Sequence, residues 1–386
     1  MSALPVPPRT APACADPALL TLSLAGGASA PRRRLLDHCG SPAAALAAGA
    51  GAWRAAGLDP AQIAALQRPD RAAVDAALAW LAQPRRHLLG CHDPDYPALL
   101  LRSPNPPLVL YLEGDPAALW HPAVAVVGSR APSAGGRDNA QRFALALATA
   151  GFAVTSGMAA GVDAAAHAAA LSRQDGLTVA VVGTGADLAY PRQHAALRER
   201  IAARGAVVSE HPPGTPARPG HFPARNRIIA GLALATLVIE AAARSGALIT
   251  ARLAAEAGRE VFALPGSIHN PLARGCHRLI RDGAGLVESA EEVLAGVAPL
   301  AAELADALRG RLHAPTERIA DDPGAMPSFP DPDYQRLWQA LGHDPTCMDS
   351  VIARTGLTAA AASSMLLTME LDGYVAVERG RYTRKP

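Results

Sequence analysis

Between residues 123 and 264, short apolar runs alternate with alanine-rich stretches that are long enough to form helices. The apolar runs lie at residues 124–127, 152–155, 178–182, 206–209, 235–240 and 260–264. Strands separated by helices at this spacing predict βαβ units and a parallel sheet covered on both faces. Polar residues are rare within the runs, as at residues 179–182 (VAVV), which is typical of strands buried on both sides. The central part of the chain is therefore predicted to be an α/β domain.

Turn-forming residues divide the N-terminal part of the chain into short helices. We expect residues 1–15 to be a disordered tail and residues 16–83 to form a small helical domain of the SAM or helix-hairpin-helix kind. The turn at residues 25–28 (AGGA) fits either a helix-hairpin-helix contact to DNA or a simple packing turn. The α/β domain is expected to span residues 84–298 and to begin with an extended, proline-rich stretch at 84–120.

The C-terminal part of the chain is predicted to contain a linker and a second small domain. Residues 299–330 are acidic and include a DDPG turn, so we expect a linker there. Within residues 331–386, one helix should hold Trp338, a second should run through 348–353, and a third should end at Leu371. A hairpin with its turn at Gly380 should follow. Three helices and a β-hairpin predict a winged helix-turn-helix.

The net charge of +2 favours no class of partner, but the charges are unevenly distributed. Residues 123–289 hold 17 arginines and 11 acidic residues, whereas residues 291–333 hold 3 arginines and 9 acidic residues. A basic centre beside an acidic connector indicates that the central domain meets a polyanion, and ordinary surface charge is the alternative.

Several classes of protein are disfavoured by the sequence. The five cysteines (Cys14, Cys39, Cys91, Cys276 and Cys347) are odd in number, widely spaced and without a CxxC pair. This pattern argues against a disulfide framework and against a zinc site. The N-terminus lacks the features of a signal peptide, and no run of about 18 uncharged apolar residues predicts a membrane span. We therefore expect a cytoplasmic protein without membrane contact, metal or other cofactor.

Loops outside the carboxyl ends of the strands are the expected binding site, as in other open α/β sheets. They are rich in small residues: Gly128, Ser129, Ser156, Gly157, Ser245 and Gly246. Such residues at helix starts leave backbone N–H groups free to face an anion, although turns after strands also need glycine for backbone geometry. Because five such loops should meet at one edge, with Arg130, Arg225 and Arg227 at loop ends, we predict a groove that binds phosphate.

A long segment, residues 210–226, is predicted to be a loop that adds an aromatic side chain to this groove. Phe222 follows His221 and comes three residues before Arg225. Sequence-tolerant binders of single strands stack a base on such an aromatic while arginine holds phosphate, at about 1–3 kcal/mol per base. Packing of Phe222 against the edge of the sheet is an equally good explanation.

Signatures of nucleotide binding and catalysis are weak. The chain has no GxxxxGK[ST] phosphate loop and no complete GxGxxG, which disfavours an ATPase or an NAD site. Asp163 and His167 have a spacing that would let them pair on one helix, although helix capping explains Asp163 as well. Glu210 and Glu240 end two strands, where each could act as a base or hold an arginine. No Ser–His–Asp set or metal-ligand cluster stands out, so no catalytic residue is assigned.

Seven motifs in a fixed order connect these loops, and together they resemble the DNA processing protein A (DprA/Smf) family. They are VGSR (127–130), SGMAAGVD (156–163), GADLAYP (185–191), SEHPPG (209–214), FPARNRIIAG (222–231), SGALIT (245–250) and GREVFALPG (258–266). The DYP at 95–97 also fits. Each motif is weak alone, but seven in this order are highly specific, and weaker motifs extend the resemblance to both flanking domains.

The resemblance implies an extended Rossmann-like fold that binds single-stranded DNA, works as a homodimer and loads the RecA recombinase in natural transformation, without being an enzyme. Relatives often place a basic residue three positions before the motif phenylalanine, where this chain has Pro219 with Arg218 beside it. The predicted DNA-binding residues are Gly128, Ser129, Arg130, Ser156, Gly157, Arg218, His221, Phe222, Arg225, Asn226, Arg227, Ser245 and Gly246.

Two other functions are weighed against this one. Nucleoside-monophosphate phosphoribohydrolases have a similar sheet but carry a PGGxGT loop, which the comparable residues 244–247 (RSGA) lack. A regulator of duplex DNA would read bases with the helix at 359–371, which has no Lys or Arg and offers only Ser363, Ser364 and Thr368 as neutral polar groups. Base-edge readout favours Arg, Lys, Asn and Gln. The alternative that we retain is a nucleotide-processing enzyme of the phosphoribohydrolase type.

Overall fold

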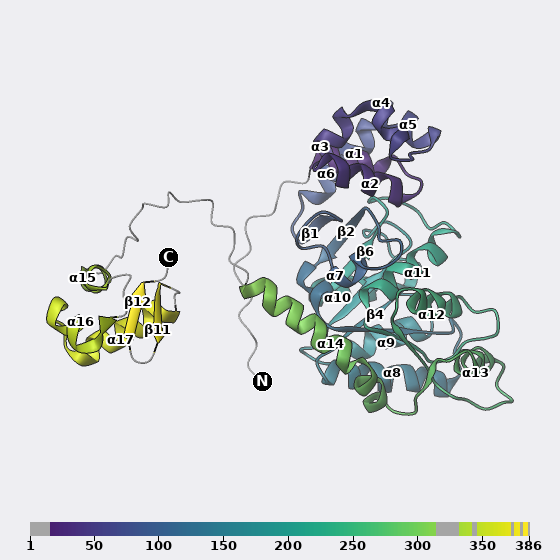
Figure 1. The fold of residues 1–386 in the computed structure, drawn as a ribbon. Helices are drawn as coiled ribbons and strands as arrows, with labels where there is room; N and C mark the ends of the chain where they lie inside the picture. The colour runs from purple at the N-terminus through teal and green to yellow at the C-terminus, as the bar shows by residue number, and fades with distance from the viewer. Residues whose placement is uncertain (1–15, 314–331, 342–345, 372–373, 379–380, 385–386) are drawn as a thin grey trace. The chain divides into compact units, whose positions relative to one another are not determined.

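The computed structural model describes residues 16–313, 332–341, 346–371, 374–378 and 381–384. The chain forms two compact units, Met1–Gly310 and Arg311–Pro386 (Figure 1). The larger unit joins a group of N-terminal helices to a mostly parallel sheet, and the smaller unit is a winged helix. The predicted fold class is therefore confirmed. The expected tail, residues 1–15, and the part of the expected linker at 314–330 lie outside the described residues.

Short helices form where the sequence places turns and caps. They are α1 (Pro17–Leu24), α2 (Ser29–Cys39), α3 (Pro42–Ala47), α4 (Gly49–Ala55), α5 (Pro60–Gln67) and α6 (Arg71–Leu81). The Asp59 carboxylate accepts the N–H of Gln62, whose side chain accepts the N–H of Asp59, so a capping box begins α5. The Gln62 amide also donates to the carbonyl oxygens of Gly26 and Ala28. The turn at 25–28 is thus fastened to α5, as a packing turn would be.

The sheet has nine strands in the order β1-β2-β6-β5-β4-β3-β7-β8-β9. They are β1 (Arg86–Gly90), β2 (Val109–Gly114), β3 (Ala123–Val127), β4 (Ala153–Ser156), β5 (Thr178–Val181), β6 (Ala206–Ser209), β7 (Ala235–Val238), β8 (Glu260–Ala263) and β9 (Gly285–Leu286). All neighbours from β6 to β9 are parallel, whereas β1 and β2 are antiparallel additions at one edge. The six strands predicted from the apolar runs are all present.

The stretch at 84–120 differs from the expectation of a merely extended segment. It holds β1, the short helix α7 (Ala98–Leu101), β2 and the 3-10 turn η1 (Pro116–Trp120). Strand β2 pairs with β6 from Tyr111↔Ser209 to Gly114↔Ala206. Tyr111 is fully buried and meets Trp80 of α6 edge-on, with ring centroids 6.5 Å apart. The N-terminal helices therefore share a hydrophobic core with this edge of the sheet.

Helices cover both faces of the sheet, as the nearly apolar strands require. The connecting helices are α8 (Ala134–Thr149), α9 (Val162–Ala170), α10 (Ala195–Arg204), α11 (His221–Leu232), α12 (Gly246–Glu256) and α13 (Arg274–Arg281). Alternate residues of β3 enter two cores: Val124 and Val126 pack with α8 and α9, whereas Ala125 and Val127 belong to the core that contains α11 and α12.

Helix α14 (Ala290–His313) follows β9 and extends into the segment where the composition favours a linker. Its residues Val297 and Leu304 are buried in the core formed by α8 and α9, and Leu300 and Ala301 pack against that core. The first part of the expected linker is therefore helical. Its acidic residues do not prevent packing, because the apolar residues lie on one face of the helix.

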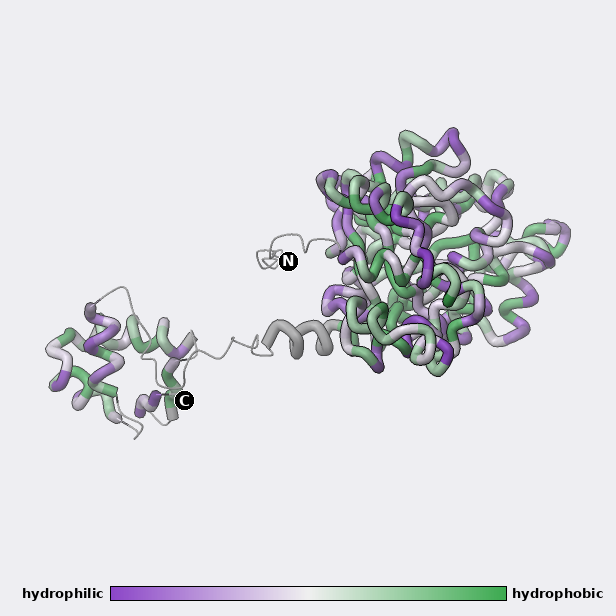
Figure 2. Tube along the Cα trace, turned by 90° about the horizontal axis from the view of Figure 1, so that it is seen from above, coloured by the Kyte–Doolittle hydropathy of each residue, from purple (hydrophilic) through white to green (hydrophobic). Residues whose placement is uncertain are grey.

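The smaller unit has the predicted order of three helices and a hairpin. It consists of α15 (Pro332–Ala340), β10 (Thr346–Cys347), α16 (Met348–Thr355), α17 (Ala359–Leu371), β11 (Val375–Glu378) and β12 (Arg381–Arg384). Hydrophobic and hydrophilic stretches alternate along its helices (Figure 2), as expected of helices that bury one face. Leu337, Val351 and Leu366 form its own core, and β10 adds a third strand beside β12.

Candidate functional site

A pocket of about 720 Å³ opens beyond the carboxyl ends of β3 and β7. These two strands are neighbours, but β3 leads through α8 to β4 on one side and β7 leads through α12 to β8 on the other. The direction of winding therefore reverses between them, and ligands of open α/β sheets bind at this point. The pocket walls come from the loop after β3, the turn before α9, Tyr190, the first turns of α11 and the start of α12.

The loop after β3 brings an arginine to the pocket. A Cβ atom on Gly128 would lie 2.8 Å from Val162 and 3.0 Å from the Glu240 carbonyl oxygen. Any side chain at this position would therefore clash, so this backbone path requires glycine. The Ser129 hydroxyl accepts the N–H of Ala131 and fixes the following turn. Arg130 is exposed, and no ion pair or hydrogen bond joins its side chain to another described residue. Its guanidinium is therefore free to meet an anion.

Phe222 lies beside this arginine, on the first turn of α11. Its ring centroid is 6.0 Å from the guanidinium carbon of Arg130 and 5.0 Å from the ring centroid of Tyr190. The expectation that Phe222 belongs to a loop reaching residue 226 is wrong, because α11 begins at His221. Proline at 223 does not stop this helix, since the first turn needs no N–H donor there.

Arg225 is also on α11 and is almost completely buried. Its guanidinium donates to the carbonyl oxygens of Gly157, at 2.7 Å, and Val181, and to the Asn226 side chain, at 3.0 Å. Burial lowers the pKa of Arg225 to about 10, and the nearby charge of Asp163 opposes that change. The expectation that Arg225 lies at a loop end is therefore wrong, since Arg225 is buried on α11 and its guanidinium joins this helix to the ends of β4 and β5.

Asp163 is the buried counter-charge of Arg225. Its carboxylate accepts the N–H groups of Gly157 and Ala159 at 3.1 and 3.3 Å. Burial raises the pKa of Asp163, while the charge of Arg225 and these two donors oppose the rise. The cap of α9 is Gly161 rather than Asp163, and His167 bonds Thr178 instead of Asp163. The pair therefore holds the floor of the pocket and forms no Asp–His dyad.

The start of α12 forms another part of the pocket wall. Ser245 caps the helix by accepting the N–H of Ala247, and Gly246 has open space where a side chain would stand. Asn226 donates to the Gly246 carbonyl oxygen at 3.4 Å, which links α11 to this helix start. A helix N-terminus exposes backbone N–H groups and favours negative charge. This wall is therefore suited to a phosphate.

Eight of the thirteen predicted residues line the pocket, and five do not. Ser156 is buried and donates to the Val126 carbonyl oxygen, and Gly157 lies under the Arg225 guanidinium. Arg218 is exposed in the loop before α11, but its neighbour Pro219 lines the pocket instead. His221 stacks on His211 with ring centroids 3.8 Å apart.

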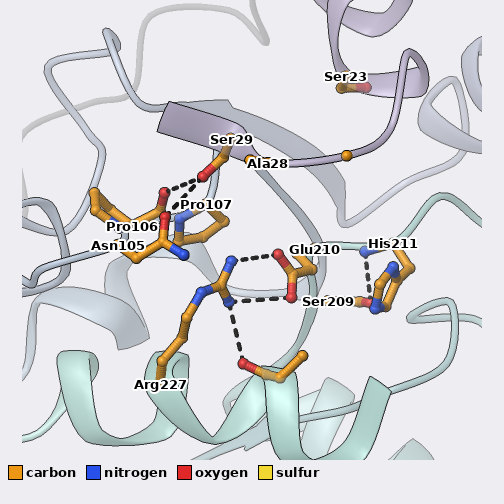
Figure 3. Close-up of polar contacts among 12 residues, drawn as sticks. Ser23, Ala28, Ser29, Asn105, Pro106, Pro107, Ser209, Glu210, His211 and Arg227 are labelled. Carbon is orange, nitrogen blue, oxygen red and sulfur yellow. Dashed lines mark hydrogen bonds and ion pairs between the residues drawn. The ribbon is translucent and has the colours of Figure 1, made fainter. Parts of the chain in front are cut away.

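Arg227 is the fifth residue outside the pocket. Its guanidinium meets both carboxylate oxygens of Glu210, at 3.0 and 2.5 Å, and also the Ala224 carbonyl oxygen (Figure 3). Beside it, the hydroxyl of Ser29 on α2 lies 3.1 Å from oxygens of Asn105 and Pro106 (Figure 3). Glu210 therefore holds an arginine, one of the two roles open to it, and does so near the N-terminal helices.

Tyr190 is an aromatic residue of the pocket that is absent from the predicted set. It lies in the GADLAYP motif, and the signal that could have found it is a large aromatic after a glycine-rich strand end. Glu240 has a structural role: its carboxylate accepts the backbone N–H and hydroxyl of Ser133 and the amide of Asn270. Among the described residues, no group of three or more His, Cys, Asp or Glu side chains could hold a metal ion.

Comparisons with known proteins agree with the motifs. Residues 87–298 match the family model described as DNA recombination-mediator protein A, and residues 314–381 match the DprA winged helix domain. Protein Smf of Escherichia coli is 41% identical over 315 residues, which are 81% of this chain and 81% of the relative. DNA processing protein DprA of Streptococcus pneumoniae is 46% identical over 53% of this chain and 71% of its own length.

One solved structure extends this similarity to the fold. The X-ray structure of DNA processing protein A from Streptococcus pneumoniae superposes with a TM-score of 0.63 at 38% identity. The match covers 71% of this chain and 95% of that one. Over the residues that the structure describes, no helix is both long and apolar enough to cross a membrane.

Proposed function

The chain belongs to the family of DNA recombination-mediator protein A, and from this premise we propose that it binds single-stranded DNA in the pocket beyond β3 and β7. The observation that carries the proposal is the unpaired, exposed guanidinium of Arg130 next to the Phe222 ring. Arginine meets phosphate and an aromatic ring meets a base, which is how sequence-tolerant proteins bind single strands. The start of α12 offers a second place for a phosphate.

Preference for single strands over duplex follows from this chemistry. A base can stack on Phe222 only if it leaves its own stack, which costs a few kcal/mol in a duplex and much less in a single strand. Little discrimination among bases is expected, because every base has a π-face and the pocket contacts proposed here involve stacking and phosphate. The eight pocket-lining residues of the predicted set are thus proposed as the DNA contacts or their immediate support.

The wider biological role is proposed from family membership. We infer that the protein protects incoming single strands and loads the RecA recombinase on them during natural transformation, as a cytoplasmic homodimer. The relatives' descriptions as DNA recombination-mediator and DNA processing proteins support a role in DNA processing. A RecA contact and a dimer contact are proposals that binding and sedimentation experiments can address.

We propose that the protein has no catalytic activity on nucleotides. Glu240, the acid at the end of β7, accepts three hydrogen bonds from Ser133 and Asn270, which supports a structural role at the start of α8 rather than a role as a general base. Adenosine monophosphate incubated with the protein should release no adenine. Release of adenine that disappears in Glu240→Gln would favour the phosphoribohydrolase alternative.

The proposed function is tested by titrating the full chain into a labelled oligothymidylate and into a hairpin duplex, across a series of salt concentrations. Binding to the single strand should be tighter, and it should weaken with salt because each phosphate contact releases about 0.7 counterion on a single strand. Equal or tighter binding to the duplex would contradict the proposal.

A further inference from the structure

We propose that the ion pair between Glu210 and Arg227 is a clamp that positions the start of α11, and with it Phe222, for single-stranded DNA. The inference rests on the proposed function and assigns to both side chains a positioning role without DNA contact. Neither side chain lines the pocket, although Arg227 belongs to the helix that carries Phe222 and Arg225 into it.

The geometry of the clamp fixes a direction as well as a distance. Two guanidinium nitrogens of Arg227 face the two carboxylate oxygens of Glu210, at 3.0 and 2.5 Å (Figure 3). A fork of two bonds restrains the rotation of both groups, which a single contact does not. The two side chains are only 17% and 18% exposed, so salt screens their attraction less than that of a surface pair. The clamp is therefore suited to hold α11 in one orientation.

The segment that carries Glu210 is itself fixed. Glu210 directly follows β6, and the hydroxyl of Ser209 donates to the Thr184 carbonyl oxygen at 2.6 Å and accepts the N–H of His211 at 3.0 Å. The ring of His211 stacks on that of His221, the first residue of α11, with centroids 3.8 Å apart. This segment therefore holds α11 at its first residue through the histidine stack and at its second turn through the ion pair.

Glu210 also lies in the field of a second arginine, Arg32 on α2. Burial lowers the pKa of Arg32 to about 10, and the charges of Glu210 and Asp59 oppose that change. The carboxylate therefore interacts with one cation on α11 and with another on the N-terminal helices. Removal of its charge would leave Arg227, the less buried of the two arginines, free to turn toward solvent.

Release of Arg227 would reach the pocket through the backbone of α11. Phe222 and Arg225 lie five and two residues before it on the same helix. Arg225 holds this helix from the floor of the pocket, at Gly157 and Val181. Without the clamp, the side of the helix that faces β6 would be held by the histidine stack alone. The first turn would then be less ordered before DNA binds, and ordering it during binding would cost affinity.

The test measures affinity for a labelled oligothymidylate in the full chain and in its Glu210→Gln, Arg227→Met and double variants. Each single variant should bind about 3- to 10-fold more weakly, the range expected when a side chain must be ordered during binding. The double variant should bind no more weakly than the weaker single variant, because the two residues act as one unit. The slope of affinity against salt should stay the same in all of them, since no phosphate contact is lost.

A direct phosphate contact by Arg227 predicts a different pattern. Glu210→Gln would then free the arginine and tighten binding, and Arg227→Met would lower the salt slope by about 0.7. Either result would overturn the clamp, as would normal binding by both single variants. Glu113→Gln is the matched control, because Glu113 pairs with Arg198 at similar exposure and neither residue lines the pocket. Its affinity should not change.

Amide hydrogen exchange of the free proteins adds a measurement that needs no DNA. Residues 221–227 should exchange faster in Glu210→Gln than in the parent, because the start of α11 opens more often. Urea denaturation checks that each variant is folded. Equal exchange in the two proteins would overturn the clamp. Faster exchange in Glu210→Gln, together with a parent protein that binds no oligothymidylate, would support the clamp and overturn the proposed function.

Discussion

The pocket of the α/β unit and the helix α17 of the winged helix are both places where a DNA-binding protein could meet DNA, yet their side chains differ. In the pocket, Arg130 is exposed and unpaired beside two aromatic rings. On α17, the side chains described as exposed include Ser363, Leu367 and Glu370, and the helix has no Lys or Arg. A phosphate could therefore pair with Arg130 in the pocket, whereas α17 offers no Lys or Arg side chain.

Of the two described arginines in the hairpin of the winged helix, one packs against the small core and the other is exposed. Arg384 donates to the Trp338 carbonyl oxygen, and its guanidinium lies 4.8 Å from the Trp338 ring centroid. That arginine closes the small core rather than facing outward, and Arg381 is the exposed cation of β12. A fold shared with proteins that read DNA therefore does not decide where DNA binds, because the side chains of the site do.

The largest effect is expected from removing the buried charge of Arg225 beneath the pocket. Arg225→Met leaves the buried carboxylate of Asp163 without its counter-charge and two carbonyl oxygens without their donor. The free energy of unfolding should fall by about 3–5 kcal/mol, as for other broken buried pairs. Urea denaturation measures it. Arg130→Met is the control, expected to change stability by less than about 0.5 kcal/mol because Arg130 is exposed.

A second prediction concerns where the larger unit ends. A fragment that stops at residue 298 lacks the part of α14 in which Leu304 is buried and Leu300 packs against the core. Its free energy of unfolding should be about 2–4 kcal/mol lower than that of a fragment that stops at residue 313, because burial of a leucine contributes about 1.5–3 kcal/mol. Equal urea midpoints for the two fragments would show that the helix end contributes nothing to the larger unit.

Acid should lower the stability of the larger unit more than that of the smaller unit. Among the described residues, a buried histidine lies only in the larger unit. Burial, with the charges of Arg225 and His194, lowers the pKa of His167 to about 3. Its Nδ1 donates to Thr178, whose hydroxyl donates to Val154, and its Nε2 has no partner. Below about pH 6.5 the unfolded chain therefore binds a proton that the folded chain refuses, so stability falls by up to about 1.4 kcal/mol per pH unit.

The measurement for this prediction is the urea midpoint of the larger unit near pH 7 and near pH 5. His167→Asn removes the titrating group and keeps a donor for Thr178, so its midpoint should change less between the two pH values than that of the parent. An equal change in both proteins would mean that His167 takes up its proton as readily in the folded chain as in the unfolded one.

The smallest effect is expected in the winged helix. Arg381→Ala removes an exposed cation of the hairpin and should change affinity for single-stranded DNA by less than about two-fold, because Arg381 does not line the pocket and exposed charges that make no specific contact contribute little. Titration of the variant into a labelled oligothymidylate measures the affinity. A loss of affinity as large as that caused by Arg130→Ala would mean that the winged helix contributes to DNA binding as much as the pocket does.

Much of the fold could be predicted because it follows from local patterns. The apolar runs gave the strands from β3 to β8, and the order of loops placed Gly128, Arg130 and Ser245 at one edge. The antiparallel strands β1 and β2 were not predicted, since their pairing is a long-range contact that a proline-rich stretch conceals. The helix start at His221 was missed because proline and glycine nearby favour a loop.

The directions of side chains were the harder part of the site. Arg225 and Arg227 are two residues apart on α11, so they point to different sides of the helix: one enters the floor of the pocket and the other meets Glu210. If residues 225–227 are taken to be part of a loop, the sequence does not show that these two arginines point in different directions. Tyr190 was likewise missed as a site residue, because only the folded chain brings the loop after β5 next to Phe222.

The position of the DNA site can be tested in one titration series with a labelled oligothymidylate, using the full chain, its Arg130→Ala variant and the fragment that ends at residue 313. The fragment should bind within about three-fold of the full chain. Arg130→Ala should bind about ten-fold or more weakly, since a charge-assisted bond contributes roughly 1.5–3 kcal/mol. Its slope of affinity against salt should be smaller by about 0.7. Loss of binding in the fragment together with normal binding by Arg130→Ala would place the DNA site in the winged helix and contradict the account.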